Sequence, residues 1–122
     1  MNREEIISYC LTYKNAYQNI PFRDRSQLVI SHKGNRKVFA WFFEKTQETY
    51  VRFRCKRESL SGYEAVSEHI RKGFQHEDIY WIEISLRHCQ EISEDILRQI
   101  IEESYQISKP GKRGKSIRWY FT

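Results

Sequence analysis

Two segments of the chain carry the residue types that bind phosphate groups. One is a short polar turn that contains Lys33, Arg36 and Lys37. The other is the C-terminal segment, whose cations are Lys109, Lys112, Arg113, Lys115 and Arg118. Cationic side chains neutralise nucleic-acid phosphates, and the aromatic residues at 119–121 could stack on bases. These residues predict nucleic-acid binding without sequence preference, because phosphate contacts carry no base code.

Both segments also have a simpler interpretation. The cations of the turn are equally consistent with a solvated loop. The C-terminal aromatic residues are costly to leave in water, so residues 117–121 could instead dock as an edge strand.

A second candidate surface follows from the alternation of two predicted strands. In residues 49–56, Arg52 and Arg54 point away from the face that carries the apolar side chains. In residues 37–44, the aromatic side chains on one face are Phe39, Trp41 and Phe43. If helices cover the other face only, arginines and aromatic rings lie together on an open sheet. Such a surface could stack bases or form a homodimer interface. The remaining alternative is that the C-terminal segment covers it and Glu83 pairs with an arginine.

We expect no catalytic residue, cofactor or metal site. The four histidines, at positions 32, 69, 76 and 88, lack metal-ligand spacing, and no phosphate-binding glycine loop or nucleophile elbow is present. Cys10, Cys55 and Cys89 fall in apolar patterns without a CxxC motif, which predicts reduced core residues. Cys55 is the one candidate nucleophile, and alternation turns it away from the neighbouring cations.

Composition and charge indicate one small domain with a basic extension. The chain has 122 residues, about the size of a single domain. Residues 1–108 hold 16 Lys and Arg against 16 Asp and Glu, so the whole net charge of +5 lies in residues 109–122. We therefore assign 1–108 to the domain and 109–122 to a basic aromatic extension. The polar, acidic start and the absence of a long apolar run predict a cytoplasmic protein without a membrane partner.

The elements that would position these residues are two clear helices and four strands. Asn2 and Glu5 are spaced as a capping box for a helix over residues 3–13, and Ser93 caps a second helix over 94–108. Strands are predicted at 27–32, 37–44, 49–56 and 80–86, with a weakly helical segment at 57–69. The order predicts an α+β, two-layer domain. Its antiparallel sheet is a meander of three strands plus a later strand, with the N- and C-terminal helices packed on one face.

Several of these segments resemble the MmcQ/YjbR-like family. Residues 3–11 resemble its first helix, and 20–22 (Ile-Pro-Phe) its Tyr-Pro-Phe element. Residues 32–40 (His-Lys-Gly-Asn-Arg-Lys-Val-Phe-Ala) resemble the sequence of its hairpin. Cys55 falls where its third strand ends in Lys-Cys, and Ser104-Tyr105 matches the Ser-Tyr of its last helix. The resemblance, over about residues 2–107, implies a frataxin-homologue-like fold described as double-wing, and a DNA-binding function.

One segment departs from the family pattern. The family has Gly-Tyr-His-Met-Asn-Lys before the fourth strand, then two positions of which the second is His, then Trp. Here Gly73 and Trp81 are kept and Phe74 is similar, while the His, Asn, Lys and His positions hold Gln75, Glu77, Asp78 and Tyr80. Because two acids stand where polar or cationic groups would face a phosphate, we do not carry that site over. The rival to nucleic-acid binding is a protein-interaction module, such as a homodimer formed through the aromatic sheet face.

Overall fold

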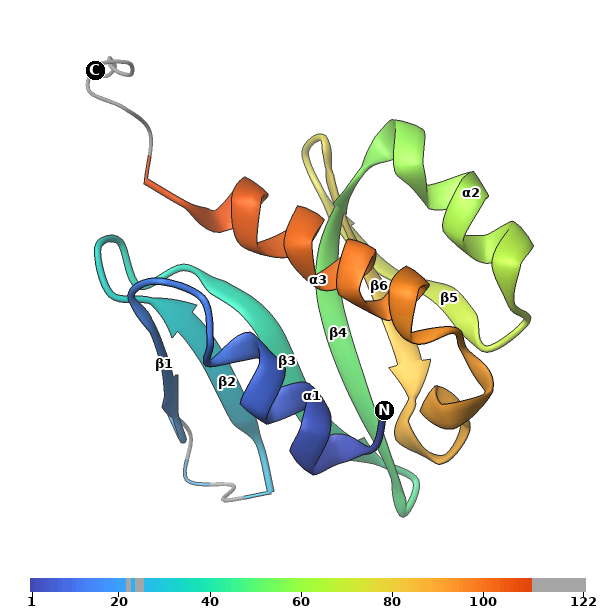
Figure 1. The fold of residues 1–122 in the computed structure, drawn as a ribbon, viewed down its shortest axis with the longest axis horizontal. Helices are drawn as coiled ribbons and strands as arrows, with labels where there is room; N and C mark the ends of the chain where they lie inside the picture. Colours follow the sequence, from blue (N-terminus) through green and yellow to red (C-terminus); the bar gives the residue numbers. More distant parts are fainter. Residues whose placement is uncertain (22, 24–25, 111–122) are drawn as a thin grey trace.

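A six-stranded antiparallel sheet, in the order β1-β2-β3-β4-β6-β5, organises the part of the chain that the structure describes (Figure 1). The structure is a computed structural model that describes residues 1–21, 23 and 26–110. The elements are α1 (Arg3–Cys10), β1 (Ala16–Asn19), β2 (Leu28–His32), β3 (Val38–Lys45), β4 (Glu48–Lys56), α2 (Arg57–Val66), β5 (Ile70–His76), β6 (Ile79–Ser85), the 3₁₀ helix η1 (Leu86–Glu91) and α3 (Glu94–Ser108).

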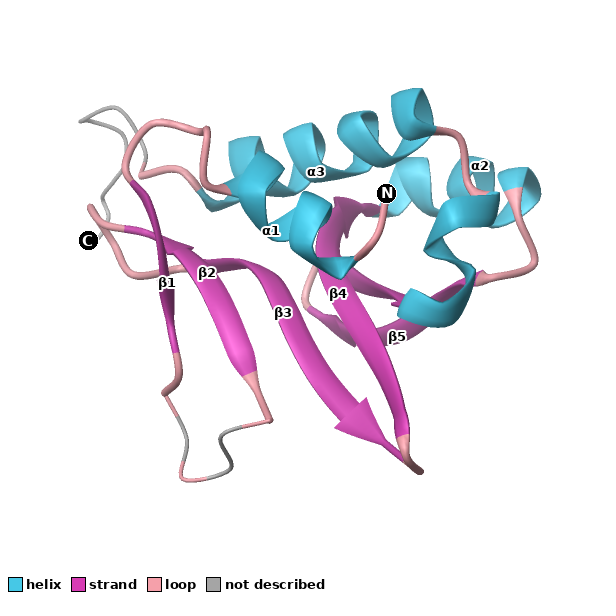
Figure 2. Cartoon of the chain, turned by 60° about the horizontal axis from the view of Figure 1, so that its bottom comes forward, coloured by secondary structure: helices cyan, strands magenta, loops and turns pink. Residues whose placement is uncertain are grey.

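The helices α1, α2 and α3 lie on one face of the sheet, and none of the described residues forms a helix on the opposite face (Figure 2). Between the layers, Ile6 of α1 and Ile100 of α3 are fully buried with the sheet residues Phe42, Phe53 and Ile82. This arrangement confirms the predicted α+β fold. Among the described residues, no helix is long and apolar enough to span a membrane.

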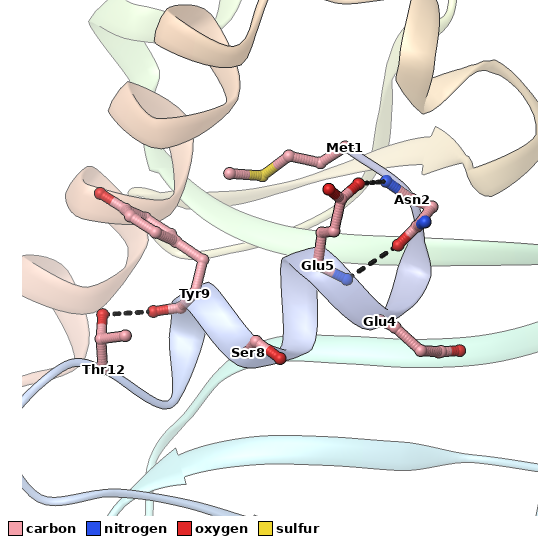
Figure 3. A pocket seen from close by; sticks show the side chains of 7 residues that line it. All are labelled: Met1, Asn2, Glu4, Glu5, Ser8, Tyr9 and Thr12. Carbon is pink, nitrogen blue, oxygen red and sulfur yellow. Dashed lines mark hydrogen bonds between the residues drawn. The ribbon is translucent and has the colours of Figure 1, made fainter.

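The two terminal helices begin where their caps predict. Asn2 accepts a hydrogen bond from the Glu5 amide at 2.9 Å, and the Glu5 carboxylate accepts one from the Asn2 amide at 2.8 Å (Figure 3). α3 has the predicted bounds. α1 is shorter than predicted: it ends at Cys10, and a series of turns leads to Asn15, whose left-handed backbone conformation, φ 64°, precedes β1.

Two edge strands and the 3₁₀ helix were not predicted from the sequence. β1 has only four residues, and none of them is fully buried. β5 buries only Ile70 and contains Gly73 and three charged or amide residues, so no apolar alternation marks it as a strand. The segment predicted as weakly helical is the helix α2, which ends at Val66.

Candidate nucleic-acid interface

The β2–β3 turn presents Lys33, Arg36 and Lys37 to solvent. The Arg36 amide donates to the His32 carbonyl at 2.7 Å, and the His32 amide donates to the Lys37 carbonyl at 3.0 Å. Arg36 adopts the positive φ of the turn, 62°. Gly34 is needed for close approach, because a Cβ there would lie 2.9 Å from Pro110 Cγ.

Three segments that are distant in sequence meet at this turn. The Asn35 side-chain amide donates to the Ser108 carbonyl at 2.9 Å, which fastens the turn to the end of α3. The Lys33 amide donates to the Asn15 carbonyl at 2.8 Å, and the Tyr105 hydroxyl donates to the Lys14 carbonyl at 2.8 Å. The α1–β1 connection, the β2–β3 turn and the C-terminal end of α3 therefore form one connected end of the molecule.

Aromatic side chains pack together beneath the surface of this end. Tyr105 stacks on Tyr13 with ring centroids 4.5 Å apart and contacts Phe39 edge to face at 5.3 Å. The buried His32 ring lies 5.9 Å from the Tyr105 ring, and its Nδ1 accepts a hydrogen bond from the Gly34 amide at 3.0 Å. These contacts hold the three segments in fixed positions relative to one another.

The surface at this end is cationic. We call it the basic end and define it by Lys14, Lys33, Arg36, Lys37 and Lys109. All five residues are exposed, and within the described chain no carboxylate lies within 4.0 Å of their charged groups. The Lys109 ammonium lies 5.8 Å from the Tyr105 ring centroid. Lys14 was not among the residues that the sequence suggested, because only the fold brings it here. The predicted contacts Lys112, Arg113, Lys115 and Arg118 lie outside the described residues.

The face without helices is covered by its own arginines. The Arg52 guanidinium lies 4.0 Å from the Phe43 ring centroid and 5.1 Å from that of Trp41, and the Arg54 guanidinium lies 4.4 Å from that of Trp81. Phe43 and Trp81 are consequently only 7% and 4% exposed. We call this set, Trp41, Phe43, Arg52, Arg54 and Trp81, the arginine–aromatic layer. Its rings pack against the arginines, and beside them the Phe74 ring of β5, 37% exposed, stacks on Trp81 with centroids 5.6 Å apart.

Further polar contacts fix both arginines. Arg52 lies 3.6 Å from the Glu83 carboxylate, which confirms the predicted pairing of Glu83 with an arginine, and Lys45 lies 3.4 Å from the same carboxylate. Arg54 Nε donates to the Val38 carbonyl at 2.6 Å. Burial lowers the pKa of the Arg54 guanidinium below its ordinary value, because desolvation disfavours the charged form.

Phe39 does not belong to the arginine–aromatic layer, so its predicted place was wrong. Ile30 pairs with Ala40 and Ser31 pairs with Val38, which leaves Phe39 as the extra residue of a β-bulge. The bulge interrupts the alternation, and the Phe39 side chain points to the helices, where it is fully buried.

The segment that departs from the family pattern is the β5–β6 hairpin. Glu77 and Asp78 form its exposed turn, with φ 56° at Glu77, and the Gln75 side chain donates to the Glu77 carbonyl at 3.0 Å. The two acids therefore point into solvent at a different hairpin from the one that carries the basic end.

All three cysteines are buried and reduced, as predicted. Burial raises the pKa of the Cys10 and Cys55 thiols to about 12 and that of Cys89 to about 11. The buried thiols are therefore protonated at neutral pH. Because the thiolate is the reactive form of cysteine, they are not poised to act as nucleophiles.

One cluster of polar side chains was not predicted from the sequence. It lies at the N-terminal end of β5. His69, His88 and Glu91 place their ligand atoms within 4.8 Å of one another. The histidines are 19 positions apart, so their proximity depends on the fold. The spacing of His88 and Glu91, three residues apart, is the sequence signal that could have indicated it.

Comparison with known structures supports the fold. A crystal structure of a Pseudomonas syringae protein aligns with a TM-score of 0.72 at 16% identity, covering 89% of this chain and 100% of that chain. A Deinococcus radiodurans protein with a DUF419 domain aligns with a TM-score of 0.73 at 15% identity, covering 93% and 83%. No curated protein shows significant similarity in sequence. The sequence model of the YjbR family matches residues 11–107, which is most of the chain. This protein belongs to the YjbR family.

Proposed function

We propose that the basic end binds the phosphate backbone of nucleic acid without sequence preference. The observation that carries this proposal is the convergence of cations from three separate segments, with no carboxylate within 4.0 Å of them in the described chain. Surface cations are commonly paired with nearby acids, and unpaired ones keep their full attraction for an anionic ligand.

The distribution of acids also favours this end. α1 and α3 carry their acidic first turns, Glu4-Glu5 and Glu94-Asp95, at the ends opposite to the basic end. In α3, with 15 residues, that separation is roughly 20 Å, about twice the screening length at physiological salt. Two carboxylates of α3 lie nearer to the basic end, but both accept hydrogen bonds: Glu102 from the Tyr13 hydroxyl at 2.8 Å, and Glu103 from the Lys56 amide at 2.7 Å. Neither lies within 4.0 Å of a charged group of the basic end. The sequence places Lys112, Arg113, Lys115 and Arg118 directly after Lys109, so they would add to the same contact.

Fluorescence anisotropy of a labelled DNA duplex tests the proposal. The full-length protein should bind, and the logarithm of its affinity should fall linearly with the logarithm of salt concentration, by about 0.9 per phosphate contact. The triple variant Lys33→Gln, Arg36→Gln, Lys37→Gln should bind more weakly, with a slope reduced by about 2 to 3.

The matched control changes the same number of exposed cations elsewhere. Arg57, Arg71 and Arg87 lie on α2, β5 and η1, away from the β2–β3 turn (Figure 1). Their triple glutamine variant should keep affinity within about threefold, since only long-range charge is lost. A variant with Lys112, Arg113, Lys115 and Arg118 changed to glutamine measures the share of the extension. Absence of binding at low salt, or equal losses in the two triple variants, would contradict the proposal.

A further inference from the structure

We infer that His69, His88 and Glu91 form a binding site for one divalent transition-metal ion of the zinc type. The Glu91 carboxylate bridges one nitrogen of each ring: Oε2 is 2.6 Å from His88 Nδ1, and Oε1 is 3.3 Å from His69 Nε2. The two imidazole rings stack with centroids 3.9 Å apart and planes 4° from parallel. Two neutral imidazoles and one carboxylate are ligands that Zn²⁺ and its neighbours in the first transition row prefer to Mg²⁺ or Ca²⁺.

The three groups are already close to ligating distance. A tetrahedral ion with bonds of about 2.0–2.1 Å holds its ligand atoms roughly 3.3 to 3.5 Å apart. The ligand atoms here lie within 4.8 Å of one another. Because the rings are stacked, the in-plane lone pairs of their nitrogens run side by side, so binding of one ion requires the imidazoles to rotate out of the stack. All three side chains reach solvent, which gives an ion a path to the site.

Each ligand is held by the hydrophobic core. In the chain, His69 precedes Ile70, His88 precedes Cys89 and Glu91 precedes Ile92, and these three following residues are buried. η1 places His88 and Glu91 one 3₁₀ turn apart on the same side. The Ser67 hydroxyl accepts from the His69 amide at 3.1 Å, which fixes the connection between α2 and β5. Ligands on anchored backbone lose little entropy when they bind an ion.

The ion would keep coordination positions for other molecules. Three protein ligands leave at least one position open on a tetrahedral ion, as in sites that bind a water or a small anion. Two of the ligands, His69 and His88, line a polar hollow of about 560 Å³ that Lys72, Glu48 and Ser85 also line. The open position would be accessible from this hollow.

The other metal-binding groups of the described chain give a matched control. The three thiols are buried, and His32 is buried with its Nδ1 bonded to the Gly34 amide. His76 lies 3.8 Å from the Glu77 carboxylate at an exposed position, so it is a histidine–carboxylate pair without a second histidine. The His76→Ala variant tests whether one histidine next to one carboxylate is enough to bind the ion.

Titration of the full-length protein with Co²⁺, purified without a histidine tag, tests the site. Wild-type protein should bind one ion per chain with the visible absorption of a four- or five-coordinate ion, and Zn²⁺ should displace it. His69→Ala and His88→Ala should each weaken binding at least about tenfold, since even supporting residues of metal sites have effects of that size. His76→Ala should bind as the wild type does. Zn²⁺ should also raise the melting temperature of the wild type and of His76→Ala only.

Glu91→Gln is a variant that we expect to fold, because this side chain is exposed and glutamine has its shape. It should keep the circular dichroism spectrum of the wild type and bind Co²⁺ at least about tenfold more weakly. The inference is overturned if the wild type shows no saturable binding of one ion. It is also overturned if His88→Ala and Glu91→Gln, both folded, bind as the wild type does, or if His76→Ala loses binding to the same extent.

Discussion

A single hydroxyl group explains one of the residues shared with the family. Ser104 of α3 is fully buried, donates to the Phe39 carbonyl at 2.6 Å and accepts from the Arg54 amide at 2.8 Å. The regular pairing of β3 with β4 begins at Ala40 and Phe53, and Ser104 bonds the backbone groups one position beyond that pair on each strand. Ser104→Ala should lower the free energy of unfolding by about 2 kcal/mol, because two buried backbone groups lose their hydrogen bonds. Urea denaturation measures this change.

Ser61 provides the control for that substitution. It lies on α2 and is exposed. Ser61→Ala should change the free energy of unfolding by less than about 0.5 kcal/mol. Equal effects of the two substitutions would show that Ser104 does not bridge the strands.

Individual residues were predictable where their surroundings are local. The alternation of β4 placed Arg52, Arg54 and Cys55 on the correct faces, since that strand is regular along its length. Phe39 and Lys14 were not predictable, because the bulge arises in the pairing of β3 with β2 and the α1–β1 connection bonds α3. The pairing of His69 with His88 has the same cause: it arises from two connections that the fold brings together.

Among the elements, strong local signals allowed correct predictions. α3 has a serine cap, an acidic first turn and an apolar stripe, and its bounds were predicted to the residue. β2, β3, β4 and β6 were predicted within two residues at each end, because apolar and aromatic residues mark them. The edge strands β1 and β5 are largely exposed, so they lack the apolar alternation on which sequence reasoning depends.

One side chain joins the β2–β3 turn to the last turn of α3, in addition to the packing of Tyr105 on Phe39. Asn35 donates to the Ser108 carbonyl and accepts from the Lys37 amide at 3.0 Å, so it joins the hairpin turn to the last turn of the helix. Asn35→Ala should cost about 1 kcal/mol of stability and speed amide hydrogen exchange in the turn and at the end of α3.

Asn19 is the corresponding control, since it is exposed on β1 and belongs to another part of the sheet. Asn19→Ala should leave exchange at the hairpin and at the end of α3 unchanged. Unchanged exchange in Asn35→Ala would mean that packing alone holds these elements together. In that case the basic end would keep its geometry in the variant, and its affinity for DNA would be the same as in the wild type.

At the scale of the whole molecule, the core holds several groups that ionise only at high pH. Burial raises the pKa of Cys10 and Cys55 to about 12 and of Cys89 to about 11, against an ordinary value of 9.0. Burial, together with hydrogen bonds to glutamates, also raises the pKa of Tyr13 and Tyr63. In the unfolded chain these groups release their protons at lower pH than in the folded protein. Their contribution to stability is therefore complete below about pH 9 and declines as the pH rises above it.

The free energy of unfolding should accordingly fall steeply between about pH 9 and pH 11. Each such group contributes a slope of up to about 1.4 kcal/mol per pH unit between its unfolded and folded pKa values. Urea denaturation at several pH values, with a reducing agent present, measures the profile. Cys10→Ala loses packing at every pH, but it also removes one titrating group, so its profile should be less steep above about pH 9 than that of the wild type. A flat wild-type profile, or equal slopes in the two proteins, would mean that the buried thiols do not control alkaline unfolding.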